Sequence, residues 1–181
     1  MNISEIMTPP SQPLECVVNW DAVEASIRNR LPDDYKDFIE KYGTGRIDRF
    51  VRVLSPVAEN VNVNLLTYGT NLLRAFREHK VAMAMRSRSF PFALFPEPGG
   101  LLPWGYSDNG DVFFWRTGDA NPNNWRVVVS DGRASLWEQF EGTMSAFLCA
   151  LLSRQYESKI VSDEEFPSNA PKFDAGGTSD D

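Results

Sequence analysis

Few side chains in this chain of 181 residues could carry acid–base, nucleophilic or metal chemistry. His79 is the only histidine, and it lies among Arg77, Glu78 and Lys80, a charged setting that favours a solvent-facing turn over a general base. One histidine and two distant cysteines cannot supply the four ligands that a structural zinc site usually takes. We therefore expect a protein without enzymatic activity, cofactor or bound metal.

The other candidates for chemistry have simpler structural explanations. Cys149 lies between apolar residues that offer no cation or base to lower the pKa of its thiol, so Cys149 and Cys16 are expected to be reduced thiols. Asp108 and Asp111 flank a turn but lack the further oxygen ligands and the closing glutamate of a calcium loop. The glycines do not lead from a strand into a helix with a following lysine, as phosphate-binding loops do.

The most informative stretch, Leu94 to Trp125, is rich in aromatic and turn-forming residues. Leu101–Tyr106 and Val112–Arg116 are predicted to be antiparallel strands. Asn109–Gly110 between them suits a tight hairpin, because asparagine tolerates a left-handed backbone and glycine adopts one without steric penalty. A stretch with so many aromatic residues, in a chain so poor in reactive groups, indicates surface recognition.

Two helices are predicted near the amino end from apolar residues at helical spacing. The first covers residues 20–31 and has Asn19 or Asp21 as its N-cap. The second covers residues 32–42, begins with a proline and two acidic residues, and ends at Gly43.

A less regular pattern predicts a helix over residues 71–80, followed by an irregular segment at 81–91. The last helix is predicted from Thr143 to Gln155 and has the best apolar stripe in the chain. The remaining strands are predicted at Phe50–Leu54, Phe92–Phe95, Trp125–Ser130 and Leu136–Phe140. Helices at both ends and no room for helices between the later strands imply an α+β fold, with helices packed on one face of a strongly bent antiparallel sheet.

Composition predicts one domain with an acidic tail. We expect an amino-terminal extension at 1–15, a domain at 16–156 and a tail at 157–181. The tail has seven acidic and two basic residues, so it carries −5 of the net charge of −7. Phe166 and Phe173 are expected to pack its first part, whereas the end, from Asp174 on, is expected to be disordered because it has nothing large and apolar to bury.

Charge and hydropathy also limit the partners. The body is mildly acidic, which favours a basic protein partner and disfavours nucleic acid. A solvated helix face and loop explain the single basic cluster better than a binding site does. No secretory leader or membrane span is expected, so the protein is predicted to be cytoplasmic. The cluster consists of Arg74, Arg77, Lys80, Arg86 and Arg88.

Several motifs together resemble the SUKH superfamily, which includes the yeast Smi/Knr-type cell-wall assembly regulators and many bacterial immunity proteins. Their order and spacing span residues 19–155, and this order carries the resemblance. The residues that carry it, and that we expect to be structural, are Leu31, Pro32, Tyr35, Phe38, Gly43, Gly45, Pro103, Trp104, Gly105, Asn109, Gly110, Trp115, Trp125, Phe147 and Leu148.

The resemblance implies a non-enzymatic α+β protein, and in bacteria many such members bind and neutralise a toxin. We therefore expect an immunity protein, a monomer or homodimer, that binds a basic toxin such as a nuclease. An intracellular regulatory scaffold and, least favoured, a small enzyme are the alternatives. Exposed polar residues are expected to form an acidic rim for the partner: Asp33, Asp37, Glu40, Tyr106, Asp108, Asp111, Asp119 and Asn123.

Overall fold

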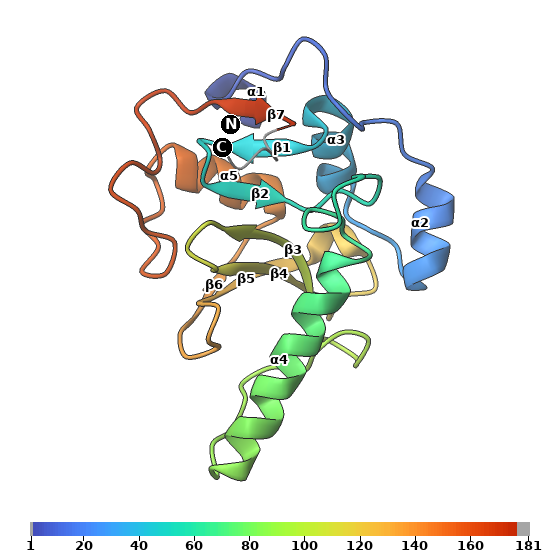
Figure 1. Ribbon diagram of the computed structural model, residues 1–181, viewed down its shortest axis with the longest axis vertical. Coiled ribbons are helices and arrows are strands. Elements are labelled where there is room, and N and C mark those ends of the chain that lie inside the picture. Colours follow the sequence, from blue (N-terminus) through green and yellow to red (C-terminus); the bar gives the residue numbers. More distant parts are fainter. Residues whose placement is uncertain (1, 177–181) are drawn as a thin grey trace.

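A seven-stranded antiparallel sheet forms the centre of the part of the chain that the computed structural model describes, residues 2–176 (Figure 1). The strands lie in the order β6-β5-β4-β3-β2-β1-β7. This arrangement confirms the predicted α+β class. In chain order the elements are α1 (Ile3–Ile6), α2 (Trp20–Ile27), α3 (Asp33–Tyr42), β1 (Gly45–Ile47), β2 (Val51–Val53), α4 (Tyr68–Met85), β3 (Leu101–Ser107), β4 (Val112–Arg116), the 3-10 helix η1 (Pro122–Asn124), β5 (Arg126–Ser130), β6 (Trp137–Phe140), α5 (Met144–Leu152) and β7 (Phe173–Ala175).

The sheet is irregular at β3. The β3–β4 register shifts between Pro103 and Gly105, as it does at a β-bulge. Glycine is required at 105 because a Cβ there would lie 2.7 Å from the Arg52 carbonyl oxygen of β2. Figure 1 shows β3 to β5 curving relative to β1 and β2.

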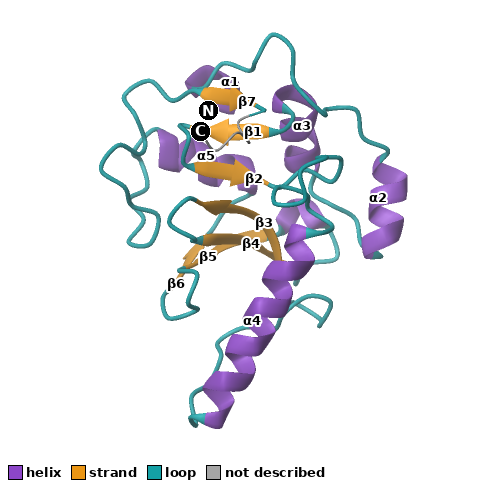
Figure 2. Ribbon diagram, viewed as in Figure 1, coloured by secondary structure: helices purple, strands orange, loops and turns teal. Residues whose placement is uncertain are grey.

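Both faces of the central strands are buried, because side chains alternate between two apolar layers. Trp104, Phe113 and Trp115 belong to the larger cluster, with α1, α3 and α5. Val112 and Phe114, their neighbours along β4, belong to a second cluster with Leu73 and Phe76 of α4. The expectation of helices on one face is correct for α1, α3 and α5, whereas α4 covers the opposite face (Figure 2).

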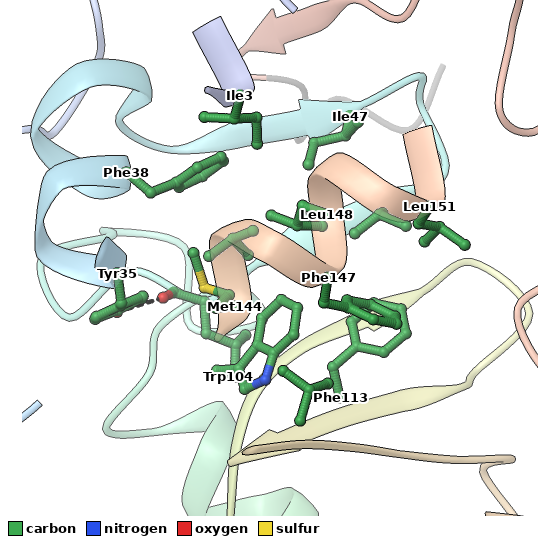
Figure 3. Packing of buried hydrophobic residues seen from close by; sticks show 14 of the residues in the cluster. Ile3, Tyr35, Phe38, Ile47, Trp104, Phe113, Met144, Phe147, Leu148 and Leu151 are labelled. Atoms are coloured by element: carbon green, nitrogen blue, oxygen red, sulfur yellow. Dashed lines mark hydrogen bonds between the residues drawn. The ribbon is translucent and has the colours of Figure 1, made fainter. Parts of the chain in front are cut away.

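The larger core is built on α5 and α3. Phe147 and Leu148 of α5 are fully buried, and the ring of Phe147 lies 6.2 Å from Trp104 and 5.9 Å from Phe113, centroid to centroid. Figure 3 shows α5 lying between these rings on one side and Phe38 and Ile47 on the other. The apolar stripes predicted for these two helices are therefore the ones that cover the sheet.

The β3–β4 hairpin uses its glycine but not its asparagine for the left-handed position. Gly110 has φ of 86°, whereas Asn109 is absent from the non-glycine residues with positive φ. The Gly110 amide donates to the Ser107 carbonyl at 2.9 Å, and the Ser107 amide donates to the Asp111 carbonyl at 2.9 Å. The turn is therefore a three-residue loop with a left-handed glycine rather than a two-residue loop with two left-handed residues.

Helix α4 is longer than predicted. It continues to Met85, through a segment that was expected to be irregular. Alanine and methionine favour the helix here although the face is not buried: Val81 and Met85 are 56% and 83% exposed. The predicted strand Phe92–Phe95 is wrong. Only Leu94 makes a bridge, to Leu101, since prolines at 91 and 96 lack the amide hydrogen that a ladder needs.

Residues on both sides of the expected domain boundaries share one core. Ile3 and Met7 from the amino-terminal stretch are buried in it, as are Ile160 and Phe166 from the acidic stretch. The Glu138 carboxylate accepts hydrogen bonds from the Ser158 hydroxyl and the Lys159 amide, both at 2.6 Å. Residues 157–176 therefore pack along the domain.

The last described strand corrects one expectation. Asp174 and Ala175 pair with β1 in β7, although disorder was predicted from Asp174 onward. Phe173 explains the difference, because its ring lies 5.2 Å from Tyr42 and 6.1 Å from Phe38 and so anchors the strand. The rest of the expected disordered end, residues 177–181, lies outside the described residues.

Candidate partner-binding site

Helix α3 presents a row of carboxylates to solvent. Asp33, Asp37 and Glu40 are exposed at positions i, i+4 and i+7, so they share one side of the helix. The opposite side is held in the core by Tyr35 and Phe38. Because the apolar side is fixed, the acidic side has one orientation relative to the sheet.

The loop after β4 joins this row. The Asp33 amide donates to Asn123 Oδ1 at 2.8 Å, and Asn123 Nδ2 donates back to Asp33 Oδ2 at 2.7 Å. Asp119 orders the same loop: its Oδ1 accepts from the Asn121 amide at 2.8 Å, and its carbonyl accepts from Trp125 Nε1 at 2.8 Å. The acidic surface is defined here as Asp33, Asp37, Glu40, Asp119 and Asn123.

The remaining predicted contacts lie elsewhere. Tyr106 and Asp108 are at the turn end of the β3–β4 hairpin, whereas Asp119 follows the other end of β4. Asp108 pairs with Arg52, whose guanidinium carbon is 5.5 Å from the centre of the Tyr106 ring. Tyr106 also donates to the Asn62 carbonyl at 3.0 Å. The structure thus places these two residues beside a separate cleft of about 360 Å³, not in one rim with α3.

Asp111 is not a surface residue, so its expected place in the rim is wrong. It is only 6% exposed, and its Oδ2 accepts from the Ser107 hydroxyl at 2.6 Å. Burial raises the pKa of this carboxyl, the Ser107 hydrogen bond opposes that shift, and Asp131 and Glu138 add to it. Asp111 therefore braces the hairpin, which the sequence concealed because aspartate is also common in exposed turns.

Two polar residues have roles that the sequence analysis missed. Asp34 Oδ2 accepts from the Ser145 amide at 2.8 Å and so joins α3 to the first turn of α5. The Glu24 carboxylate accepts from the Leu31 amide at 2.9 Å and pairs with Lys36 at 2.5 Å. Both link residues from separate elements, a relation that helical spacing alone does not reveal.

Among residues 2–176, no three or more histidine, cysteine, aspartate or glutamate side chains gather as metal ligands would. His79 lies on α4, within the helix predicted over residues 71–80, and is half-buried rather than fully solvent-facing, with its ring edge-on to Phe76 at 6.2 Å. Cys149 is buried, and that burial raises the pKa of its thiol. No helix of the described part is long and apolar enough to cross a membrane.

Comparison with known proteins gives one match. The sequence profile of the SUKH family described as SMI1-KNR4 cell-wall matches residues 18–148. No curated protein and no solved structure matches the chain. The matched range runs from just before α2 into α5 and so includes all of α3, β1 to β6 and α4.

The matched range contains the motif residues and the geometry that follows from them. Leu31, Tyr35 and Phe38 fill the core behind the acidic surface. Trp104 and Trp115 belong to the same core cluster and extend from the sheet. Since the profile covers well over half of the chain and the fold is an open antiparallel sheet with helices, the protein belongs to the SUKH family described as SMI1-KNR4 cell-wall.

Proposed function

We propose that this protein is a cytoplasmic immunity protein, which binds a cognate toxin and neutralises it by protein–protein contact. The observation that carries the proposal is the family match over residues 18–148. The SUKH family comprises immunity and regulatory proteins that are generally non-enzymatic. Neutralisation by contact needs no reactive group.

The acidic surface gives the proposal its chemistry. Asp33, Asp37, Glu40 and Asp119 are exposed, so they keep most of their hydration and add little to affinity as single ion pairs. Together they attract a basic protein and raise its association rate, an effect that weakens as salt screens the charges. A basic toxin, such as a nuclease, is the partner that this surface suits.

A regulatory scaffold is the second candidate. The description of the matched family names the cell wall, which favours a role beside cell-wall regulators. Such a protein binds its clients without abolishing an enzyme activity. Inhibition is therefore the property that separates the two functions.

The test is co-production with the product of the gene adjacent to this protein's gene, as the candidate toxin. We expect cells that make only the candidate toxin to die, and cells that make both the candidate toxin and this protein to survive. Cell death with and without this protein would rule out that pairing, whereas a stable complex that leaves the toxin's activity unchanged would favour the scaffold.

Paired variants test the role of the acidic surface. Asp37 is exposed and Glu164 is an exposed acid in the carboxy-terminal segment. Asp37→Lys should slow association by roughly two- to tenfold at low salt, as rim charges do, and Glu164→Lys should change it less. Equal effects of the two variants would show that net charge, and not this surface, governs encounter.

A further inference from the structure

An apolar groove of about 620 Å³ lies between α2 and the first half of α4. Leu66 and Leu73 line it from α4 and the residues before it, Ile27 lines it from α2, and Leu102 of β3 lies at its base. None of these side chains is part of the acidic surface or of the hairpin cleft. The groove is therefore separate from the surfaces considered so far.

The groove stays open because α2 is anchored at one end. The Trp20 ring packs edge-on to Tyr35 at 5.8 Å, its Nε1 donates to Glu40 Oε1 at 2.8 Å, and Val23 is buried. The carboxy-terminal end of α2, at Ile27, is only half-buried. Figure 1 shows α2 standing beside the body of the molecule, and residues 26–29 at this end line the groove.

The groove is cationic on a protein of net charge −7. Arg28, at the end of α2, and Arg77, on α4, both line it and are exposed. Arg77 donates to the Phe95 carbonyl, which holds it against the groove. No aspartate or glutamate is among the described residues that line this groove. An apolar base between two arginines is complementary to a ligand that is both apolar and acidic.

The dimensions of the groove suit a peptide. The α4 side extends from Leu66 to Arg77, about 16 Å at a rise of 1.5 Å per residue, which matches roughly five residues of extended chain. Ser26, Asn29 and Thr70 line it as well and offer hydroxyl and amide groups that can hydrogen-bond a peptide backbone. A bilayer surface or a nucleic acid would need a broader basic face than these two arginines make.

We propose that this groove binds a short segment of a partner protein in which a large apolar side chain is flanked by carboxylates. The apolar side chain packs on Leu66, Leu73 and Ile27, and the carboxylates pair with Arg28 and Arg77. In this contact the protein supplies the positive charges, whereas at the acidic surface it supplies the negative charges. The groove therefore gives the protein a second, chemically distinct binding site.

A peptide titration of the full chain tests the site without any toxin. The probe is the capped peptide Asp-Leu-Phe-Glu, followed by amide chemical shifts. One control peptide replaces both acids with lysine, and another replaces Leu-Phe with Ser-Ser. We expect shifts at Ile27, Thr70 and Leu73 with the probe, and at least tenfold weaker binding of each control. Equal binding of all three peptides, or shifts confined to other surfaces, would overturn the proposal.

Three variants locate the site. Arg28→Gly removes one cation and suits the backbone, because Arg28 has φ of 56°. Thr70→Trp places a ring in the groove from an exposed position. Thr70→Trp should weaken the probe at least tenfold and Arg28→Gly roughly three- to fivefold, as the loss of one exposed ion pair does, whereas Arg86→Gln, an exposed charge outside the groove, should leave its affinity within twofold. Unchanged affinity for the probe in Arg28→Gly and Thr70→Trp, with native spectra, would contradict the site. The protein binding to anionic vesicles in a way that the probe peptide cannot compete with would contradict it as well.

Discussion

Replacing Tyr35 with phenylalanine isolates one buried hydrogen bond that joins α3 to the sheet. The Tyr35 hydroxyl donates to the Leu54 carbonyl at 2.6 Å, and both residues are fully buried (Figure 3). Phenylalanine leaves no large cavity but removes the donor from a buried carbonyl, which costs about 1–3 kcal/mol. For a protein of this size the melting temperature should fall by roughly 2–12 °C. Urea unfolding followed by tryptophan fluorescence measures the free energy directly.

The alkaline pH dependence adds a second signature. Burial raises the pKa of Tyr35 well above its ordinary value of 10.0. Above that pH the unfolded chain releases the proton while the native state retains it, so the wild type loses stability as pH rises. Tyr35→Phe lacks this loss, and the difference in unfolding free energy between the two proteins should therefore shrink above about pH 10.

The matched control is Tyr68→Phe. Tyr68 is half-buried on α4, and its hydroxyl has no hydrogen bond to the part of the chain described here. This variant should change the unfolding free energy by less than about 0.5 kcal/mol. A loss in Tyr35→Phe no larger than in the control, or a difference that stays constant above pH 10, would show that the buried hydroxyl of Tyr35 does not stabilise the fold in this way.

Three further predictions concern stability and order. Glu24→Gln should lower the free energy of unfolding by about 1 kcal/mol at neutral pH. Burial raises the pKa of Glu24, but hydrogen bonds and Lys36 outweigh burial and lower the pKa from 4.5. In urea melts the loss should therefore fade as pH falls through that lower pKa. Gly45→Ala should displace β7, because its Cβ would lie 2.4 Å from the Asp174 carbonyl oxygen; faster amide exchange at 173–175 would show this, and unchanged exchange would contradict it. Glu138→Ala should free residues 158–159 and speed cleavage there in limited proteolysis, whereas Gln139→Ala, at an exposed neighbour, should not.

Strong local patterns in the sequence predicted the central elements. The apolar stripes of α3 and α5 have a helical repeat, and β3 and β4 are apolar and aromatic runs on either side of an Asn-Gly turn, so their type and place follow from short stretches of sequence. Of the elements of three or four residues, β2 and β6 were predicted, whereas α1, β1, η1 and β7 were not, because they are too short to show a period. β7 depends on Phe173 meeting Tyr42, a contact between residues far apart in the chain.

The candidate site was partly predictable for the same reason. The acids on α3 follow from helical spacing, because a buried apolar face leaves the opposite face exposed. The reciprocal pair of Asp33 and Asn123, and the burial of Asp111, depend on which loops meet in space. The groove beside α2 was not predicted, since its lining comes from α2, α4 and β3, and spacing within one element reveals none of it.

Titration of the toxin's enzyme activity with the purified protein tests whether this protein neutralises a toxin by direct contact. The product of the adjacent gene, as the candidate toxin, is assayed on its own substrate at fixed concentration, with increasing amounts of this protein. We predict stoichiometric loss of activity, with slower association at high salt and in Asp37→Lys. Full toxin activity in the presence of a large excess of correctly folded protein would contradict neutralisation by binding.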